Sequence, residues 1–413
     1  MSRNRRTFLA TVAALGVAGC TATLPDQIGS DDDGPDEADD GAPPSDADEG
    51  SDGELLFDFR DIHEWDLAAG NLSPDREAAV TGEVSARLDG ERDPVLRIDR
   101  TGLDLDLTDR RLSIVGRVHS PEPSQAVDVI VTDVDGNRMR FRTRFFKTDP
   151  ETEFMPLDLG IYEWDDTAPD LAAIDTLRIQ TRFDENAGGT LWVDSVYLEP
   201  MPETPKLMIQ WDDGFETQYT NGLPILTEYD IPATTFVNTA NLGDGRLTVE
   251  QLTEMQEAGW EVGSHLMTHA NLRDLSEQEQ EAQIRGAKEW LIDNGFEEGA
   301  EFFAYTYGSY DRTGYALVEE YHTYAMVGGD PGYGLPRNPI HVGRASHRSL
   351  EAAREYVDTL VQWGGVGALF WHEIPAETTL PEFEGIMQYI TDRREAGELD
   401  VITLSDLAAL QGR

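Results

Sequence analysis

The sequence predicts a multidomain chain in which an antiparallel β-sandwich precedes an incomplete β/α barrel. Residues 54–200 contain short alternating strands broken by turn residues, with no long stretch of helical period. Residues 206–413 alternate apolar strands with amphipathic helices. The first pattern favours an antiparallel sandwich, and the second favours parallel strands joined by helical crossovers. A chain of 413 residues is long enough for both domains.

The first 20 residues have the pattern of a targeting segment. Arg5 and Arg6 precede an apolar stretch, residues 8–18, that is too short to span a bilayer. Because the stretch leads into Val-Ala-Gly-Cys, residues 1–20 resemble a twin-arginine export signal that ends in a lipobox. This resemblance implies export and a lipid anchor at Cys20, which would hold the protein to the outer face of the membrane. The alternative is an unmodified thiol that is lost with a cleaved signal.

Acidic residues dominate the composition. They number 80 against 32 basic residues, and the formal net charge is -48. Such a charge repels nucleic acid and anionic lipid, so neither is expected as a partner. The surface resembles that of salt-loving archaeal proteins, and an acidic protein from an ordinary medium is the alternative. Residues 21–53 contain almost no large apolar side chain and are expected to form a disordered acidic tether. The only cysteine is Cys20, which excludes an intrachain disulfide.

Within the sandwich, Asp135-Gly136-Asn137 separates two alternating runs and predicts a hairpin. The last run, residues 189–200, resembles the final strand of jelly-roll carbohydrate-binding modules. Trp65, Trp164 and Trp192 could stack on sugar rings, although a tryptophan in a sandwich more often belongs to the core. Both interpretations stay open.

The second domain begins at Lys206, after a proline-containing linker at residues 201–205. Its roughly 210 residues predict a small or incomplete barrel, in which chemistry occurs at the carboxyl ends of the strands. Strands are expected at residues 206–211, 233–238, 302–307, 324–328, 367–372 and 400–404. Helices are expected at residues 248–260, 276–296, 349–365 and 382–397.

Polar side chains gather at the expected strand ends. Asp212 and Asp213 directly follow the first strand of this domain. His265 and His269 are four residues apart, so on a helical turn both imidazoles would face one side. Two histidines and one carboxylate bind Zn²⁺, Fe²⁺ or a similar ion and leave positions open for water and substrate. Taken alone, the aspartates could form a simple turn and the histidines a chance pair.

Two further clusters follow in the chain. His372 comes directly after an apolar strand pattern and is either a packed core histidine or an acid at the same barrel mouth. Tyr305 and Tyr307 lie where another strand runs into a loop, so they either line the barrel top or face substrate.

In this order and at these separations, the clusters of residues 206–410 resemble the polysaccharide deacetylase family with its NodB homology domain. Gln-Trp-Asp-Asp-Gly, at residues 210–214, stands where that family has a Thr-Phe-Asp-Asp-Gly-like motif. Ser-His-Leu-Met-Thr-His, at residues 264–269, matches its His-Ser/Thr-x-x-His element except at Leu266, and residues 370–373 match its Leu-x-His element loosely. Residues 304–308 replace its Arg-x-Pro-Tyr-Gly motif and lack both the arginine and the proline.

The resemblance implies metal-dependent removal of acetyl groups from an N-acetylated cell-surface polysaccharide or exopolysaccharide. The residues that match the family's metal ligands are Asp213, His265 and His269; zinc is the first expectation, and other divalent ions stay open. Asp212 would be the general base and His372 the general acid. The backbone N–H of Tyr307 would assist at the oxyanion.

Arg344, which follows a later strand, is a candidate for the missing guanidinium; a surface arginine on an acidic protein is the alternative. Two rival functions remain. One is a different amide hydrolase on the same barrel, and the other is a catalytically inactive glycan-binding protein, which the altered third motif favours. The sequence leaves the polymer and the oligomeric state open.

Overall fold

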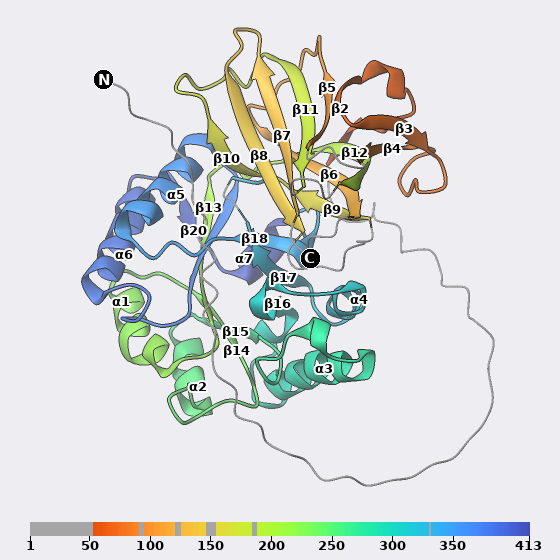
Figure 1. Ribbon diagram of the computed structural model, residues 1–413. Helices are drawn as coiled ribbons and strands as arrows, with labels where there is room; N and C mark the ends of the chain where they lie inside the picture. The colour runs from red at the N-terminus through yellow and green to blue at the C-terminus, as the bar shows by residue number, and fades with distance from the viewer. Residues whose placement is uncertain (1–52, 91–94, 120–124, 146–153, 184–187, 330–331) are drawn as a thin grey trace, which may run out of the picture.

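The computed structural model describes residues 53–413 except 91–94, 120–124, 146–153, 184–187 and 330–331. The β-sandwich lies above the β/α barrel in Figure 1. The targeting segment with Cys20, and the tether apart from Gly53, lie outside the described residues. No helix in the described part of the chain combines the length and the apolarity needed to cross a membrane.

Two antiparallel sheets form the sandwich, as the sequence predicts. One has the order β3-β4-β12-β6-β9, with β1 also paired to β12, and the other has the order β10-β8-β7-β11-β5-β2. The strands are β1 (Glu54–Phe57), β2 (Asp66–Ala69), β3 (Asn71–Asp75), β4 (Ser85–Gly90), β5 (Val95–Arg100), β6 (Arg110–His119), β7 (Gln125–Asp133), β8 (Arg138–Phe145), β9 (Met155–Asp158), β10 (Gly160–Trp164), β11 (Ile174–Arg182) and β12 (Gly189–Pro200).

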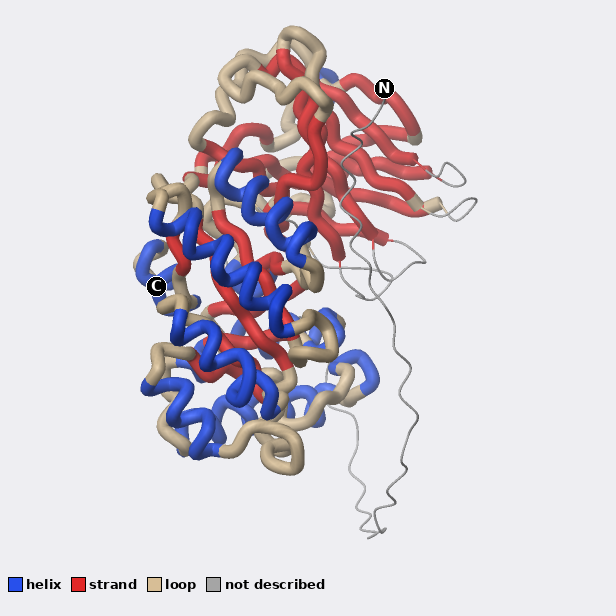
Figure 2. The backbone as a smooth tube through the Cα atoms, turned by 90° about the vertical axis from the view of Figure 1, so that its left-hand side faces the viewer, coloured by secondary structure: helices blue, strands red, loops and turns tan. Residues whose placement is uncertain are grey.

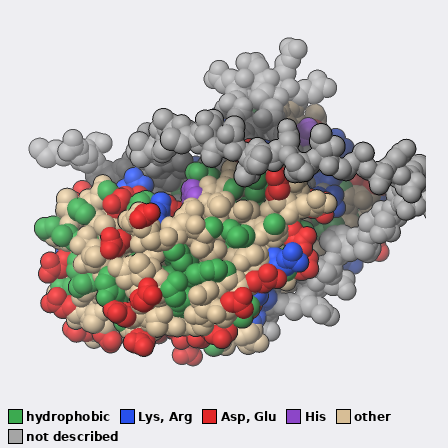
Figure 3. Space-filling view, turned by 90° about the horizontal axis from the view of Figure 1, so that it is seen from below, with side chains coloured by type: hydrophobic (Ala, Val, Ile, Leu, Met, Phe, Trp, Pro, Cys, Tyr) green, Lys and Arg blue, Asp and Glu red, His purple; other side chains and the backbone are tan. Residues whose placement is uncertain are grey.

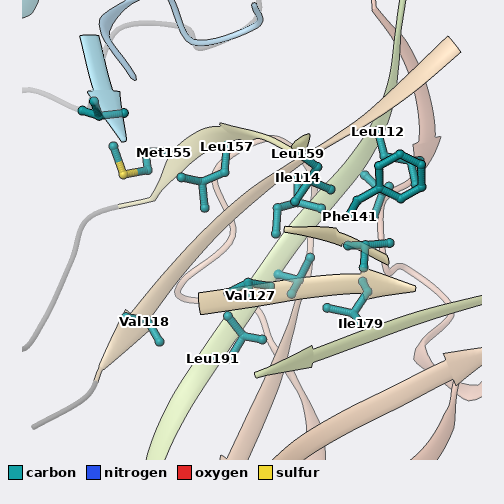
Figure 4. Packing of buried hydrophobic residues seen from close by; sticks show 14 of the residues in the cluster. Leu112, Ile114, Val118, Val127, Phe141, Met155, Leu157, Leu159, Ile179 and Leu191 are labelled. Atoms are coloured by element: carbon teal, nitrogen blue, oxygen red, sulfur yellow. The ribbon is translucent and has the colours of Figure 1, made fainter. Parts of the chain in front are cut away.

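The expected hairpin at Asp135-Gly136-Asn137 joins β7 to β8. Gly136 adopts φ 90°, and the Asp133 carboxylate accepts the N–H of Asn137 at 2.8 Å, which closes the turn. Because strand side chains alternate between two faces, every second residue points between the sheets. Figure 4 shows this core, which includes Leu112, Ile114, Phe141, Leu157, Ile179 and Leu191.

The sandwich tryptophans are not exposed sugar platforms. Trp65 is 5% exposed and belongs to the sandwich core, as the core interpretation expects. Trp192 is 6% exposed but lies outside that core, because Leu191 and Val193 on either side of it face inward and its own ring is covered by Arg87 and Arg117. Trp164 packs edge-on against Trp363 of the barrel domain, with ring centroids 5.6 Å apart. Burial and packing thus account for all three side chains.

The barrel strands are parallel and follow one another around the sheet in the order β18-β17-β16-β15-β14-β13-β19. A parallel bridge between Ala345 and Leu369 nearly closes the ring. Helices cover its outside (Figure 2). The strands are β13 (Lys206–Asp212), β14 (Thr234–Val237), β15 (Glu261–Ser264), β16 (Phe302–Ala304), β17 (Tyr324–Gly328), β18 (Val342–Arg344), β19 (Val366–Trp371) and β20 (Asp400–Val401), which pairs with β13. The helices are α1 (Leu223–Glu228), α2 (Val249–Glu257), α3 (Glu277–Asp293), α4 (Arg312–Tyr321), α5 (Leu350–Trp363), α6 (Leu380–Glu395) and α7 (Leu404–Leu410).

Several expected elements differ in length. The strand predicted at 302–307 ends at Ala304, because the chain enters a 3₁₀ turn in which Tyr307 has φ 58°. The strand predicted at 400–404 ends at Val401, because Thr403 caps α7 through the N–H of Asp406. Five further elements, β15, β18, α1, α4 and α7, were not among those expected from the sequence.

The sandwich and the barrel share a buried interface. Arg111 of β6 is fully buried and donates hydrogen bonds to the carbonyls of Gly332 and Trp363 in the barrel domain. Arg337, between β17 and β18, pairs with Glu199 of β12 at 3.3 Å, and both side chains are buried. The sandwich core also continues into one barrel cluster that includes Leu272, Ile284, Phe303 and Val327.

Candidate metal centre and catalytic pair

The two adjacent aspartates separate because the chain turns sharply between them. Asp212 is the last residue of β13 and is 3% exposed. Asp213 and Gly214 have φ 70° and 61°, so two consecutive residues occupy the left-handed region. That region is unfavourable for a non-glycine residue and is enriched at functional sites. The turn therefore allows each carboxylate to take different partners.

Asp213, His265 and His269 form a group whose ligand atoms lie within 4.8 Å of one another. Asp213 Oδ1 is 3.1 Å from His269 Nε2 and 3.5 Å from His265 Nε2. His265 Nδ1 lies 2.7 Å from the Ala304 carbonyl, which can only accept, so Nδ1 carries the proton and Nε2 presents a lone pair to the carboxylate.

These three residues fit a divalent cation. Burial lowers the pKa of His265, which keeps this imidazole neutral as a ligand must be. Asp213 Oδ1 lacks a hydrogen-bond partner among the described residues, although it is buried. Acceptor atoms that face one another in this way can share a cation.

The histidines do not lie on a helical turn, so that expectation was wrong. They belong to the loop after β15, and Leu266 between them has φ 68°. The N–H of His265 donates to the Val237 carbonyl at 2.9 Å, and the N–H of Thr268 donates to Gln283 at 2.9 Å. The loop is thus fixed from both sides, which brings the imidazoles together without helical spacing.

Arg344 pairs with Asp212 rather than with solvent. Its Nη1 is 2.8 Å from Asp212 Oδ1 and its Nη2 is 2.6 Å from Oδ2, a bidentate geometry. Arg344 ends β18 and is 4% exposed, so the surface alternative was wrong. Burial raises the pKa of Asp212, but the guanidinium of Arg344 is the largest of the opposing effects, and the net result is a lowered pKa.

His372 lies beside Asp212 and is oriented by Glu377, a residue that the sequence analysis did not identify. His372 Nδ1 is 3.1 Å from Glu377 Oε1, and the backbone N–H of His372 donates to Glu377 Oε2 at 2.7 Å. Burial lowers the pKa of His372, but Glu377 and Asp212 outweigh it and raise the pKa. Nε2 remains directed at Asp212 Oδ2, 4.0 Å away. Only the short separation along the chain could have pointed to Glu377.

Tyr307 lies at the mouth of the site, whereas Tyr305 does not. Tyr307 is 54% exposed, its ring meets His269 edge-on at 4.4 Å, and its hydroxyl donates to the His269 carbonyl at 3.4 Å. Tyr305 is 2% exposed and packs against Phe303 in the core. The expectation that both tyrosines line the barrel top was therefore correct for Tyr307 alone.

A second arginine that sequence reasoning missed supports the metal-site turn. Arg246 donates to the Asp213 carbonyl at 2.6 Å and lies over the Phe215 ring at 3.6 Å. Such outer contacts fix the orientation of a ligand that would otherwise move with its loop.

A parallel β/α barrel whose strand ends carry an Asp-His-His group beside a carboxylate and an imidazole defines a class of metal-dependent hydrolytic sites. Residues 200–326 match the model of the family described as polysaccharide deacetylase. The C-terminal part of this chain therefore contains a polysaccharide deacetylase domain.

Curated relatives match the sequence of this chain over part of their length. YxkH of Bacillus subtilis, whose name assigns it to the polysaccharide deacetylases, is 30% identical over 125 residues, 28% of this chain and 44% of that protein. A poly-β-1,6-N-acetyl-D-glucosamine N-deacetylase of Staphylococcus aureus is 30% identical over 132 residues, 27% of this chain and 44% of that protein. The matches thus span less than half the length of each relative.

Solved structures show weaker likeness. A family 4 carbohydrate esterase from Streptomyces lividans, in complex with acetate, is 17% identical, with a TM-score of 0.37; the match covers 48% of this chain and 92% of that one. Peptidoglycan deacetylase PdaC from Bacillus subtilis is 18% identical, with a TM-score of 0.36, covering 51% and 93%.

Proposed function

We propose that this protein is a metal-dependent hydrolase that removes acetyl groups from an N-acetylated polysaccharide, with a polymer of N-acetylglucosamine as the first candidate. The observation that carries the proposal is the pairing of a buried carboxylate and an imidazole, Asp212 and His372, next to the Asp-His-His group. The name of the Staphylococcus aureus relative supports the choice of polymer.

Asp213, His265 and His269 would hold the divalent ion, for which zinc is our proposal. When bound, the ion supplies Lewis acidity toward the acetyl carbonyl and lowers the pKa of water. Two of these ligands are held in place by other residues. Arg246 contacts the backbone of Asp213, and the Ala304 carbonyl accepts from His265 Nδ1. The protein provides a fixed ligand geometry that need not reorganise during turnover.

Asp212 and His372 move the protons. Asp212, kept ionised by Arg344, accepts a proton from the attacking water. His372, whose pKa is raised by Glu377 and Asp212 against the effect of burial, donates a proton to the nitrogen as the C–N bond breaks. The products are acetate and a free sugar amine. The backbone N–H of Tyr307 is proposed to stabilise the negative charge that develops on the carbonyl oxygen.

The inactive glycan-binding alternative loses its main support. It rested on the missing arginine of the third motif, and Arg344 supplies a guanidinium to Asp212 in a bidentate pair. A different amide hydrolase on the same barrel would have the same site and would differ from the proposed deacetylase only in its substrate.

We also propose that the protein is exported and held at the outer face of the membrane by lipid on Cys20. The arginine pair and the apolar stretch that end at this residue support the proposal. The acidic residues 21–53 would then separate the two folded domains from the membrane surface.

Acetate release from N-acetylglucosamine oligomers, measured in high salt with wild type and Asp212→Asn, tests the proposed activity. We expect release by wild type, and loss of release with retained metal in the variant. A folded, metal-loaded wild type that releases no acetate from β-1,6- or β-1,4-linked oligomers would contradict the proposed substrate.

A further inference from the structure

One buried amide contacts the backbone of both the proposed base and the proposed acid. Gln218 is fully buried and opens a π-helical turn, Gln218–Gly222, shortly after β13. Its Nε2 donates to the Asp212 carbonyl at 2.6 Å and to the His372 carbonyl at 3.0 Å. The same amide group therefore joins the ends of β13 and β19.

The orientation of this amide is fixed by a third strand. Gln218 Oε1 accepts a hydrogen bond from the hydroxyl of Thr235 in β14 at 2.7 Å, and Thr235 is also fully buried. Because carbonyl groups accept and never donate, the NH₂ group must face Asp212 and His372. In a buried site, a side chain of this size without hydrogen-bond donors would leave both carbonyls without this partner, at a substantial cost.

The hydrogen bonds of Gln218 lie just beyond the end of the β13–β19 strand pairing. The β13–β19 pairing ends at the Trp211–Trp371 pair, one residue before the proposed base and acid. One turn beyond Gln218, Asn221 donates to the Ile374 carbonyl at 2.9 Å and holds the same loop at a second point. The turn therefore replaces the ladder as the link between the two loops.

We propose that Gln218 is a positioning residue that sets the separation of Asp212 from His372, 4.0 Å between Oδ2 and Nε2. The proposal rests on the deacetylase function proposed above. Proton transfer depends steeply on distance and alignment, so a shift of about 1 Å can cost about 100-fold in rate. Gln218 touches only backbone carbonyls of these residues, and it acts through them rather than on substrate.

Gln218→Met tests the proposal, because methionine keeps the length of the side chain and removes its hydrogen bonds. Gln280→Met is the matched control, since Gln280 is 1% exposed and its Nε2 donates to the Leu275 carbonyl and to Asp311, away from the site. We expect kcat for acetate release to fall about 10- to 100-fold in Gln218→Met, with KM and bound metal per chain unchanged. Gln280→Met should keep kcat within about twofold while lowering the melting temperature similarly.

Equal kcat in the two variants at equal metal content would overturn the proposal. If Gln218→Met does not fold, Thr235→Val decides, because it leaves Gln218 in place but removes the group that orients the amide. We then expect a severalfold loss of kcat at constant KM, and an unchanged kcat contradicts the positioning role of Gln218. If wild type itself releases no acetate, the proposed function fails separately. Crystal structures of wild type and the same variants then test the positioning role of Gln218. An unchanged separation between Asp212 and His372 in the variants overturns this role, and a larger separation supports it.

Discussion

Arg344 holds Asp212 in a bidentate ion pair, although 132 residues separate them in the chain. Both side chains are buried, and Arg344 Nη1 also donates to Gln210 at 3.3 Å. The guanidinium comes from the end of β18, not from the motif after β16 that lacks an arginine. The barrel therefore brings a distant strand end to the same carboxylate.

Removing this guanidinium should destabilise the fold strongly. Arg344→Met leaves a buried carboxylate without its partner, so we expect the free energy of unfolding to fall by about 3–5 kcal/mol in urea titrations. The double variant Arg344→Met/Asp212→Asn removes both charges and should recover most of that loss, but no acetate release. Arg285→Met is the control: this half-exposed arginine pairs with the exposed Glu281 and Glu289, and its loss should change the unfolding free energy by less than about 1 kcal/mol. A single Arg344 variant as stable as wild type would contradict the buried pair.

The alkaline limb of the pH–rate profile should depend on Glu377. This carboxylate raises the pKa of His372, which must be protonated to act as the acid. Glu377→Gln removes that effect, so the pKa falls and the alkaline limb of the kcat profile should move to lower pH, with turnover kept at acid pH. Glu373→Gln should leave the limb in place, because Glu373 has no side-chain contact with His372 among the described residues. An unshifted limb in Glu377→Gln would mean that another group sets it.

Metal binding should separate the two adjacent aspartates. Asp213→Asn and His265→Ala should each lose the bound ion, measured by elemental analysis after dialysis, because they remove ligand atoms of the Asp-His-His group. Asp212→Asn should keep about one ion per chain. A chelator should lower the melting temperature of wild type, and added Zn²⁺ should restore it, since an ion that binds only the folded state stabilises it. Loss of the ion from Asp212→Asn would reverse the proposed roles.

The sequence was informative where function depends on strand ends, because parallel strands bring their carboxyl ends to one edge. Asp212, Asp213 and His372 could be found in this way. Their detailed geometry could not, since it depends on left-handed residues such as Asp213 and Leu266 that follow no periodic pattern.

Positioning residues left still less signal in the sequence. Glu377 and Gln218 reach the site through loop and turn conformations. Arg344, by contrast, was a candidate from the sequence, and it reaches Asp212 from the end of β18. The two-layer sandwich and the parallel barrel were predictable from alternation alone. Their shared interface depends on Arg111, which in the sequence looks like any other exposed strand arginine.

Salt should stabilise the protein. Acidic side chains are scattered over the face seen from below in Figure 3, and the net charge is -48. Raising NaCl from 0.1 M to 1 M shortens the Debye length from about 10 Å to about 3 Å, which weakens the repulsion between these carboxylates. We therefore expect the melting temperature to rise with NaCl. A melting temperature that falls between these concentrations would contradict the expectation of a salt-adapted surface.

The sandwich should be necessary for the stability of the barrel domain. A chain that begins at Lys206 loses Arg111, whose guanidinium pairs with the carbonyls of Gly332 and Trp363. It also loses Glu199, the partner of Arg337, and the sandwich part of the hydrophobic cluster to which Phe303 and Val327 belong. Newly exposed apolar surface costs about 25 cal/mol per Å² and promotes association.

We expect this shortened chain to melt at a lower temperature than the chain of residues 53–413 and to bind a hydrophobic dye. Within the longer chain, Arg111→Met should reproduce part of the loss, because it removes the hydrogen bonds to the carbonyls of Gly332 and Trp363. Arg60→Met is the matched control, since Arg60 is exposed in the sandwich and pairs only with Asp58 among the described residues. A barrel that keeps its melting temperature and its activity without residues 53–205 would show that the interface only joins two independent domains.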